Sequence, residues 1–353
     1  MVVAMIRYGV LLGLAAVALV SAGKDPIADD IARWKHALAA DTVTVGLMAQ
    51  VKQSGAPPVD VAAEALHKNR RAFALLRLGN ARTTLEPGFQ LPANPTVDDF
   101  NAARARLAPR FDAKAIAALA GAKETSAFGR ALAQSSAMQG KETFDASFNY
   151  GEATEPLFGL YYLHQGAAYL DYAAFAAEAG KTLPGAGAKA PALRSLAPEI
   201  RKLRDEMLAV YRPPLSIDRH PEFIGASSAT KEAMEYDRAG YREAALLRYL
   251  QAAVRFAPLR PDARALSGEA LAAKMEAARK QLADPKVDHS IGTLFLEVAG
   301  SDADTARAGH AFFASAVVED VLPRYFAALQ PSASAATDTP PEVTVTLVRW
   351  PYT

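Results

Sequence analysis

Tyr161, His164 and Asp171 come closest, by type and spacing, to a chemical site in this sequence. Asp171 follows His164 by seven positions and Tyr161 precedes it by three, so one helix would place all three on a single side. An aspartate that orients a histidine beside a tyrosine can serve in acid–base chemistry, and such a face can also bind a ligand, a metal or a haem. Aromatic residues at helical spacing are equally typical of a packed core. We therefore expect either a ligand-binding face or a buried one.

The other histidines do not form a metal-binding pattern. Glu64 and His67 make one Glu-x-x-His pair, whereas a di-iron bundle needs two such pairs and further carboxylates. Towards the end of the chain, Asp288 is expected to cap the helix that follows it, and Glu297 to pair with Arg307 across a turn. The sequence therefore predicts no metal site and no cofactor.

A polar segment, 212–222 (RPPLSIDRHPE), is long for a connection inside a helical domain. Long connections of this kind are often functional. His220 is the residue in it that is best suited to contact a polar ligand. The alternative is a loop that only faces solvent.

Composition and motifs exclude several classes of function. The chain has 353 residues, no cysteine, 51% hydrophobic residues and a net charge of +1. Thiolate chemistry is therefore excluded, and no basic patch indicates nucleic-acid binding. The sequence contains no Gly-x-Ser-x-Gly elbow, Walker loop or Gly-x-Gly-x-x-Gly fingerprint. We expect a protein that is not an enzyme.

Residues 1–22 have the composition of a secretory signal peptide. Arg7 precedes an apolar run, and Val20 and Ala22 supply the small residues that a signal peptidase requires. The run is short for a membrane span, which takes about 20 apolar residues. We therefore expect export to the periplasm or the extracellular space. The alternative is an uncleaved anchor that holds the protein at the inner membrane, facing the periplasm.

The part of the chain that carries the candidate residues is predicted to be helical throughout. Apolar residues recur at helical spacing, and caps are predicted at Asp25 and at Thr96 with Asp99. Helices are expected to break at 55–58 and to end at 79–80, where Pro and Gly occur. The fold class is therefore all-α, built from antiparallel helix pairs in two subdomains. These cover residues 23–180 and 193–330, with a Gly- and Pro-rich linker at 181–192.

The segment 233–258 (AMEYDRAGYREAALLRYLQAAVRFAP) resembles one tetratricopeptide hairpin. Gly240 and Tyr241 would form its turn, and Ala245, Tyr249 and Ala252 follow at the spacing that packs a second helix on the first. The predicted pair, 228–258, has its first helix beginning at 228. No second copy occurs at the period of about 34 residues that such arrays use. The resemblance implies a helical protein-interaction module.

The last 23 residues, 331–353, differ in kind from the rest. A Pro- and Ser-rich linker precedes 342–350 (EVTVTLVRW), whose alternation is typical of a strand. A single strand needs a partner for its backbone groups, so it can add to the sheet of another chain. The predicted partner-binding residues are Val343, Val345, Leu347 and Trp350.

Together these features favour an exported helical scaffold of the bacterial envelope that binds a protein partner or a second copy of itself. Two alternatives remain open. One is a periplasmic protein or enzyme that binds a ligand, metal or haem on the face of Tyr161, His164 and Asp171. The other is an accessory subunit of a membrane complex, anchored by residues 1–22.

Overall fold

The computed structural model describes residues 25–41, 46–92, 94–151, 155–214, 217–261, 263–305 and 308–330. All regular secondary structure in these residues is helical, apart from one isolated β-bridge between Lys189 and Val287. The all-α prediction is therefore confirmed for the described chain.

The first half of the chain forms a bundle of long helices, here called the N-terminal bundle. Within it α7 packs along α9, α3 along α4, and α4 along α9. Its helices are α2 (Pro26–Ala40), α3 (Gly46–His67), α4 (Arg71–Phe89), α5 (Val97–Leu107), α6 (Ala113–Ala120), α7 (Ala127–Ala146), α8 (Phe148–Gly151) and α9 (Pro156–Gly180), with a 3₁₀ turn at Ala108–Phe111.

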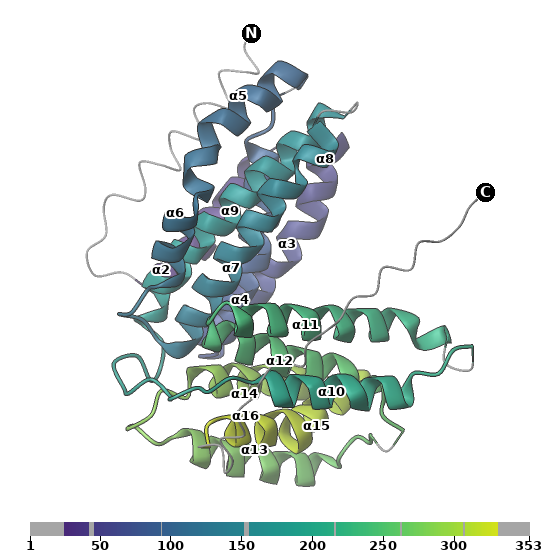
Figure 1. Cartoon of the computed structure of the whole chain (residues 1–353). Coiled ribbons are helices and arrows are strands. Elements are labelled where there is room, and N and C mark those ends of the chain that lie inside the picture. The colour runs from purple at the N-terminus through teal and green to yellow at the C-terminus, as the bar shows by residue number, and fades with distance from the viewer. Residues whose placement is uncertain are drawn as a thin grey trace, which may run out of the picture.

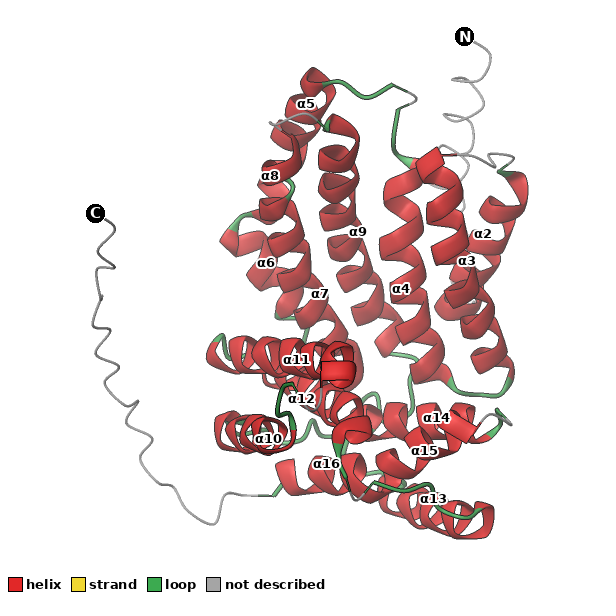
Figure 2. Ribbon diagram, turned by 90° about the vertical axis from the view of Figure 1, so that its right-hand side faces the viewer, coloured by secondary structure: helices red, strands yellow, loops and turns green. Residues whose placement is uncertain are grey.

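The second half, here called the C-terminal layer, lies across the lower ends of the bundle (Figures 1 and 2). Its helices are α10 (Ala197–Val210), α11 (His220–Arg238), α12 (Arg242–Phe256), α13 (Gly268–Leu282), α14 (Ser290–Ala303), α15 (Ala308–Ala316) and α16 (Leu322–Ala328), with short turns at Ile217–Arg219 and Ala257–Leu259 and a π-helical segment at Val317–Val321.

One apolar core runs through both halves. Leu75 of α4 and Phe128 of α7 belong to the same buried cluster as Leu247 of α12 and Phe295 of α14. Residues 181–192 form the loop between the halves, and Leu183 within it is buried in this cluster. The two halves therefore share one buried apolar core.

Two predicted helix ends are wrong. Helix α3 continues through Pro57 and Pro58, and α4 continues past Gly79. Close packing requires glycine at both places, because a Cβ on Gly55 would lie 2.4 Å from Leu85, and one on Gly79 would lie 2.4 Å from Tyr172. These glycines allow neighbouring helices to pack closely, and neither glycine ends its own helix. The predicted caps at Asp25 and Thr96 are confirmed.

Helices α11 and α12 form one antiparallel hairpin. The turn between them places Gly240 at φ +82°, a conformation that glycine adopts without strain. Tyr236 and Tyr249 are buried between the two helices and their neighbours. Helix α11 begins at His220, eight residues before the expected start at Ser228. The likeness to a tetratricopeptide unit stays a prediction.

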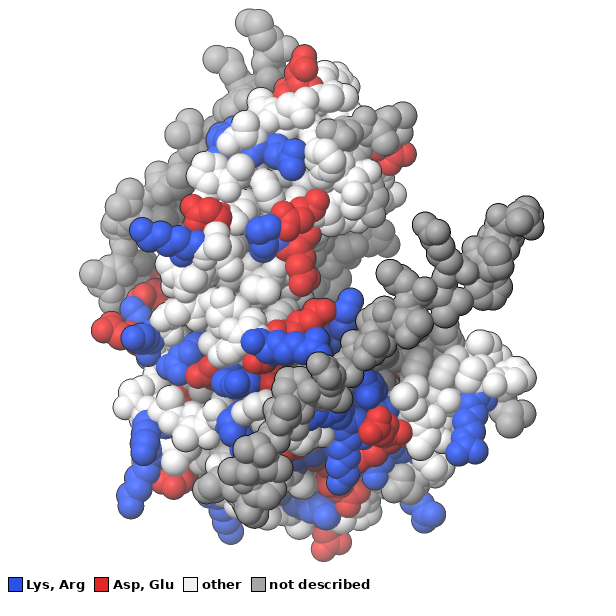
Figure 3. Space-filling view, in the orientation of Figure 1, with Lys and Arg blue, Asp and Glu red and all other residues white. Residues whose placement is uncertain are grey.

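The expected signal segment, 1–22, and the expected strand with Val343, Val345, Leu347 and Trp350 lie outside the described residues. No described helix combines the length and the apolar character needed to cross a membrane. On the face drawn in Figure 3, basic and acidic side chains alternate, and neither sign forms a continuous patch.

Candidate functional site

The three polar residues predicted to share a face of α9 each have a separate environment. The Tyr161 hydroxyl donates to the carbonyl oxygen of Thr84 on α4, at 3.3 Å. The Asp171 carboxylate accepts a hydrogen bond from Arg110 at 2.6 Å. Among the described residues no hydrogen bond joins Asp171 to His164, so the expected Asp–His pair is not formed. The two residues lie about 10.5 Å apart along α9, and the carboxylate pairs with Arg110 instead.

His164 is a buried core residue, with 4% of its surface exposed. Its Nδ1 has no hydrogen-bond partner among the described residues. Burial, with a smaller contribution from the charge on Arg106, lowers the pKa of His164 to about 4. The His164 side chain is therefore neutral near pH 7. It fits the expectation of a buried face better than that of an acid–base group.

His220, the residue predicted to serve a ligand in segment 212–222, lies at the start of α11. Its Nδ1 is 2.6 Å from the Tyr211 hydroxyl, and Tyr211 stacks on Phe223 with ring centres 4.0 Å apart. The neighbouring charges compensate one another, since Arg219 pairs with Asp218 and Glu222. His220 and its neighbours therefore pack on one another at the tip of the α10–α11 pair.

Among the described residues, no three histidine or carboxylate side chains are placed to hold one ion. Glu64, half of the Glu-x-x-His pair, accepts a hydrogen bond from Lys68 at 2.8 Å. Arg307, the expected partner of Glu297, lies outside the described residues.

A cavity of about 400 Å³ lies where the N-terminal bundle meets the C-terminal layer. We call it the junction cavity. Helices α4, α7 and α9 of the bundle and α12 and α14 of the layer form its walls. Its volume falls within the range of about 300 to 1,000 Å³ that is typical of small-molecule sites. This cavity is the candidate site of the protein.

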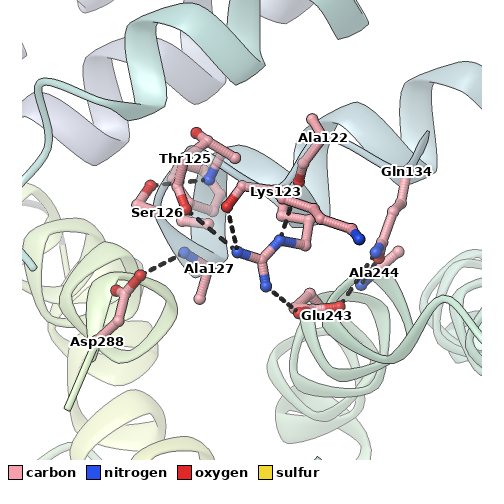
Figure 4. A network of polar contacts seen from close by, with 12 residues as sticks. Ala122, Lys123, Thr125, Ser126, Ala127, Gln134, Glu243, Ala244 and Asp288 are labelled. Carbon is pink, nitrogen blue, oxygen red and sulfur yellow. Dashed lines mark hydrogen bonds and ion pairs between the residues drawn. The ribbon is translucent and has the colours of Figure 1, made fainter. Parts of the chain in front are cut away.

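A polar clamp between α7 and α12 fixes one side of the junction (Figure 4). Arg130 donates to Glu243 at 2.7 Å and to the carbonyl oxygen of Ala122 at 3.1 Å. Gln134 donates to Glu243 at 3.1 Å and accepts from the backbone N–H of Ala244 at 3.0 Å. The first turn of α12 has no side-chain cap of its own, so Gln134 satisfies one of its free donors.

The start of α7 is capped from the C-terminal layer. Asp288, just before α14, accepts from the backbone N–H of Ala127 at 2.5 Å, and Ser290 accepts from that of Phe128 at 2.9 Å. Asp288 also accepts from the N–H of Ser290, as the sequence predicted for a cap of α14. One carboxylate thus serves two helix starts, one in each half.

A second clamp joins α14 to α4 on the other side of the junction. Glu297 accepts from the backbone N–H of Phe73 at 2.7 Å, within the first turn of α4. Burial raises the pKa of Glu297 to about 7, against the opposing effect of these backbone donors and of Arg70 and Arg71. Phe73 also lines the junction cavity, so the clamp forms part of its wall.

The chemistry of the lining favours binding of a polar molecule. The polar side chains come from four helices: Asn80 and Thr83, Ser135, Ser136 and Gln139, Tyr169 and Tyr172, and Arg248, Gln251 and Arg255. The described lining contains no aspartate, glutamate, histidine or cysteine. Two arginines are its only charged residues, so the cavity can hold a polar or negatively charged ligand.

A second group of charges is buried inside the N-terminal bundle. Asp30 and Arg82 are each 7% exposed, and Asp30 pairs with both Arg33 and Arg82. The guanidinium of Arg82 also lies 4.7 Å from the ring centre of Phe175. Burial raises the pKa of Glu86, whose carboxylate is 3.9 Å from Arg82. We call this group the bundle charge cluster.

The sequence contained weak signals for the junction. Arg248, Gln251 and Arg255 recur at helical spacing on one face of α12, and Glu297 interrupts an otherwise apolar run. These patterns indicate a polar stripe and a buried carboxylate. They do not show that five distant segments meet around one cavity.

Comparison of the chain with protein-family models, with curated proteins and with solved structures gave no significant match.

Proposed function

We propose that the protein binds a small polar molecule in the junction cavity. The observation that carries the proposal is the cavity itself, about 400 Å³ in volume and walled by helices of both halves. Two polar clamps hold these halves in register, so the site is formed before a ligand arrives. The lining offers hydrogen-bond donors and acceptors but no carboxylate, imidazole or thiol, which supports binding over catalysis.

We further propose that the protein is exported before it acts. The charge at Arg7, the apolar run and the small residues Val20 and Ala22 support this part of the proposal. Mass spectrometry of the protein isolated from envelope and cytosolic fractions tests it. The mature chain should lack the first 22 residues, and an intact chain confined to the cytosol would contradict export.

The binding proposal is tested by a thermal-shift screen with amino acids, sugars and short organic acids. Asn80→Trp places a large ring at an exposed position of the cavity wall, and Asn101→Trp makes the same change at an exposed site on α5. At least one compound should raise the melting temperature of the wild type and of Asn101→Trp, but not that of Asn80→Trp. A screen without any response, or an equal response of both variants, would contradict the proposal.

A second candidate function is the scaffold role predicted from the sequence. Three large apolar side chains are exposed near the α10–α11 tip: Leu208 at 55%, Ile217 at 58% and Ile224 at 48%. Such residues can contact a protein partner. Deleting 331–353 and, separately, replacing Ile217 with Ser should reduce co-purification or oligomer mass if the protein is a scaffold. Unchanged association in both variants would remove this candidate.

A further inference from the structure

The junction cavity changes in polarity from one end to the other. Helices α4 and α7 both begin at α14, where Glu297 and Asp288 cap them, and then run away from it. The α14 wall is apolar, with Leu294, Phe295 and Val298. The parts of α4 and α7 nearest to α14 add Phe73, Leu76 and Leu132. This end of the cavity is therefore suited to an apolar group.

The lining turns polar further along the same helices. Thr83 follows Phe73 by ten residues, or about 15 Å along a helix. Ser136 and Gln139 succeed Leu132 on α7, and Tyr169 lies at this end on the antiparallel helix α9. A ligand that spans the cavity therefore meets apolar groups at one end and hydroxyl and amide groups at the other.

The positive charge comes from α12, which crosses the cavity. Arg248 acts electrostatically on Tyr169 and so lies near the polar end. Its guanidinium is 3.0 Å from the carboxylate of Glu232, which compensates its charge. Arg255, seven residues later on the same face, is exposed. Its hydrogen bond among the described residues goes to the carbonyl oxygen of Gly225 at 3.4 Å, and it has no acidic partner there. One positive charge in the lining is therefore uncompensated.

We propose that the ligand is a small amphipathic monocarboxylate, with its apolar body against α14 and its carboxylate on the arginine face of α12. The inference rests on the proposed function and specifies the ligand of that site. Arg255 supplies the charge without an acidic partner among the described residues, and Arg248, which is paired with Glu232, supplies a second set of donors. A guanidinium binds a planar carboxylate through two parallel hydrogen bonds, which an amide cannot reproduce.

Titration calorimetry with matched acids and amides tests the proposal. The probes are octanoate and octanamide, and para-hydroxyphenylpropionate and its primary amide. The full-length protein is compared with Arg255→Gln and with the control Arg238→Gln, an exposed arginine at the end of α11. At least one acid should bind at least about tenfold more tightly than its amide, and Arg255→Gln should remove that difference. Arg238→Gln should retain it.

Two results would overturn the inference. If acid and amide bind the wild type equally, or if Arg255→Gln keeps the preference, the ligand is not recognised by its charge, while the proposed function still stands. If neither pair binds but an uncharged compound of the thermal-shift screen does, the ligand class is wrong. If no compound of either experiment binds, the proposed function falls as well.

Discussion

The junction cavity and the bundle charge cluster both contain arginines, but they differ in how the charge is compensated and in how far the arginines are exposed. In the cluster, Asp30 lies between Arg33 and Arg82, and Phe175 covers the Arg82 guanidinium. At the junction, Arg255 has no acidic partner among the described residues, and a cavity adjoins it. An arginine within the fold does not by itself mark a binding site. The charge must also be uncompensated and must face open volume.

Loss of a charge in the bundle charge cluster should cost the protein more stability than loss of an exposed charge. Arg82→Met leaves the carboxylate of Glu86 without its nearest cation and weakens the compensation of Asp30. Removing one partner of a buried ion pair costs about 4 kcal/mol. Urea denaturation should show this loss, whereas Arg238→Met should change the unfolding free energy little. Carboxylate affinity of the folded Arg82→Met protein should not change. A stable Arg82→Met protein would show that the cluster is not structural.

Glu297 at the junction should make the stability of the protein depend on pH. The pKa of Glu297 is about 7 in the folded protein and 4.5 for an ordinary glutamate, so folding favours the protonated acid. Its contribution is fully present below pH 4.5 and is lost as the pH rises through 7. The loss amounts to about 3 kcal/mol. Unfolding free energies measured from pH 4.5 to 8 should fall for the wild type and stay flatter for Glu297→Gln. Parallel curves would contradict this assignment.

A helix cap supplied across the junction should contribute more to the free energy of unfolding than a cap within one helix. Asp288→Ala removes acceptors from the starts of both α7 and α14 and should cost about 2 kcal/mol. The matched control is Asp112→Ala, which removes only the cap of α6 and should cost about 1 kcal/mol. Equal losses in urea denaturation would show that the junction gains nothing from sharing one carboxylate between two helices.

The smallest predicted effect concerns the charge of Arg248 and its contribution to carboxylate binding. Glu232→Gln removes the compensation of Arg248 and leaves two uncompensated arginines at the cavity. Carboxylate affinity should rise about threefold, with little change for the amide, because an exposed charge interaction is worth less than 1 kcal/mol. Calorimetry with octanoate and octanamide measures both. A fall in carboxylate affinity would mean that Glu232 serves mainly to position Arg248.

Local signals in the sequence predicted local structure well. The caps at Asp25 and at Thr96 with Asp99 depend on neighbouring residues, and the structure confirms them. The predicted breaks at Pro57 and Gly79 are wrong, and the neighbours that pack on Gly55 and Gly79, Leu85 and Tyr172, lie far along the chain. A local rule is overridden where a tertiary contact stabilises the helix more than the local residue destabilises it.

The candidate site was predicted less well, for a related reason. His164 and Asp171 do share a helix, but Arg110 pairs with Asp171 and burial keeps His164 neutral. The junction cavity draws on five helices, whose lining residues run from Phe73 to Val298. Spacing within one helix cannot show which distant helices meet, so the cavity required the fold.

The most direct test of the account is a crystal structure of the protein with para-hydroxyphenylpropionate. The ligand should lie in the junction cavity, with its carboxylate within hydrogen-bonding distance of Arg255 and its ring beside Leu294 and Phe295. A ligand bound elsewhere, or a junction cavity that holds only water under saturating ligand, would contradict it.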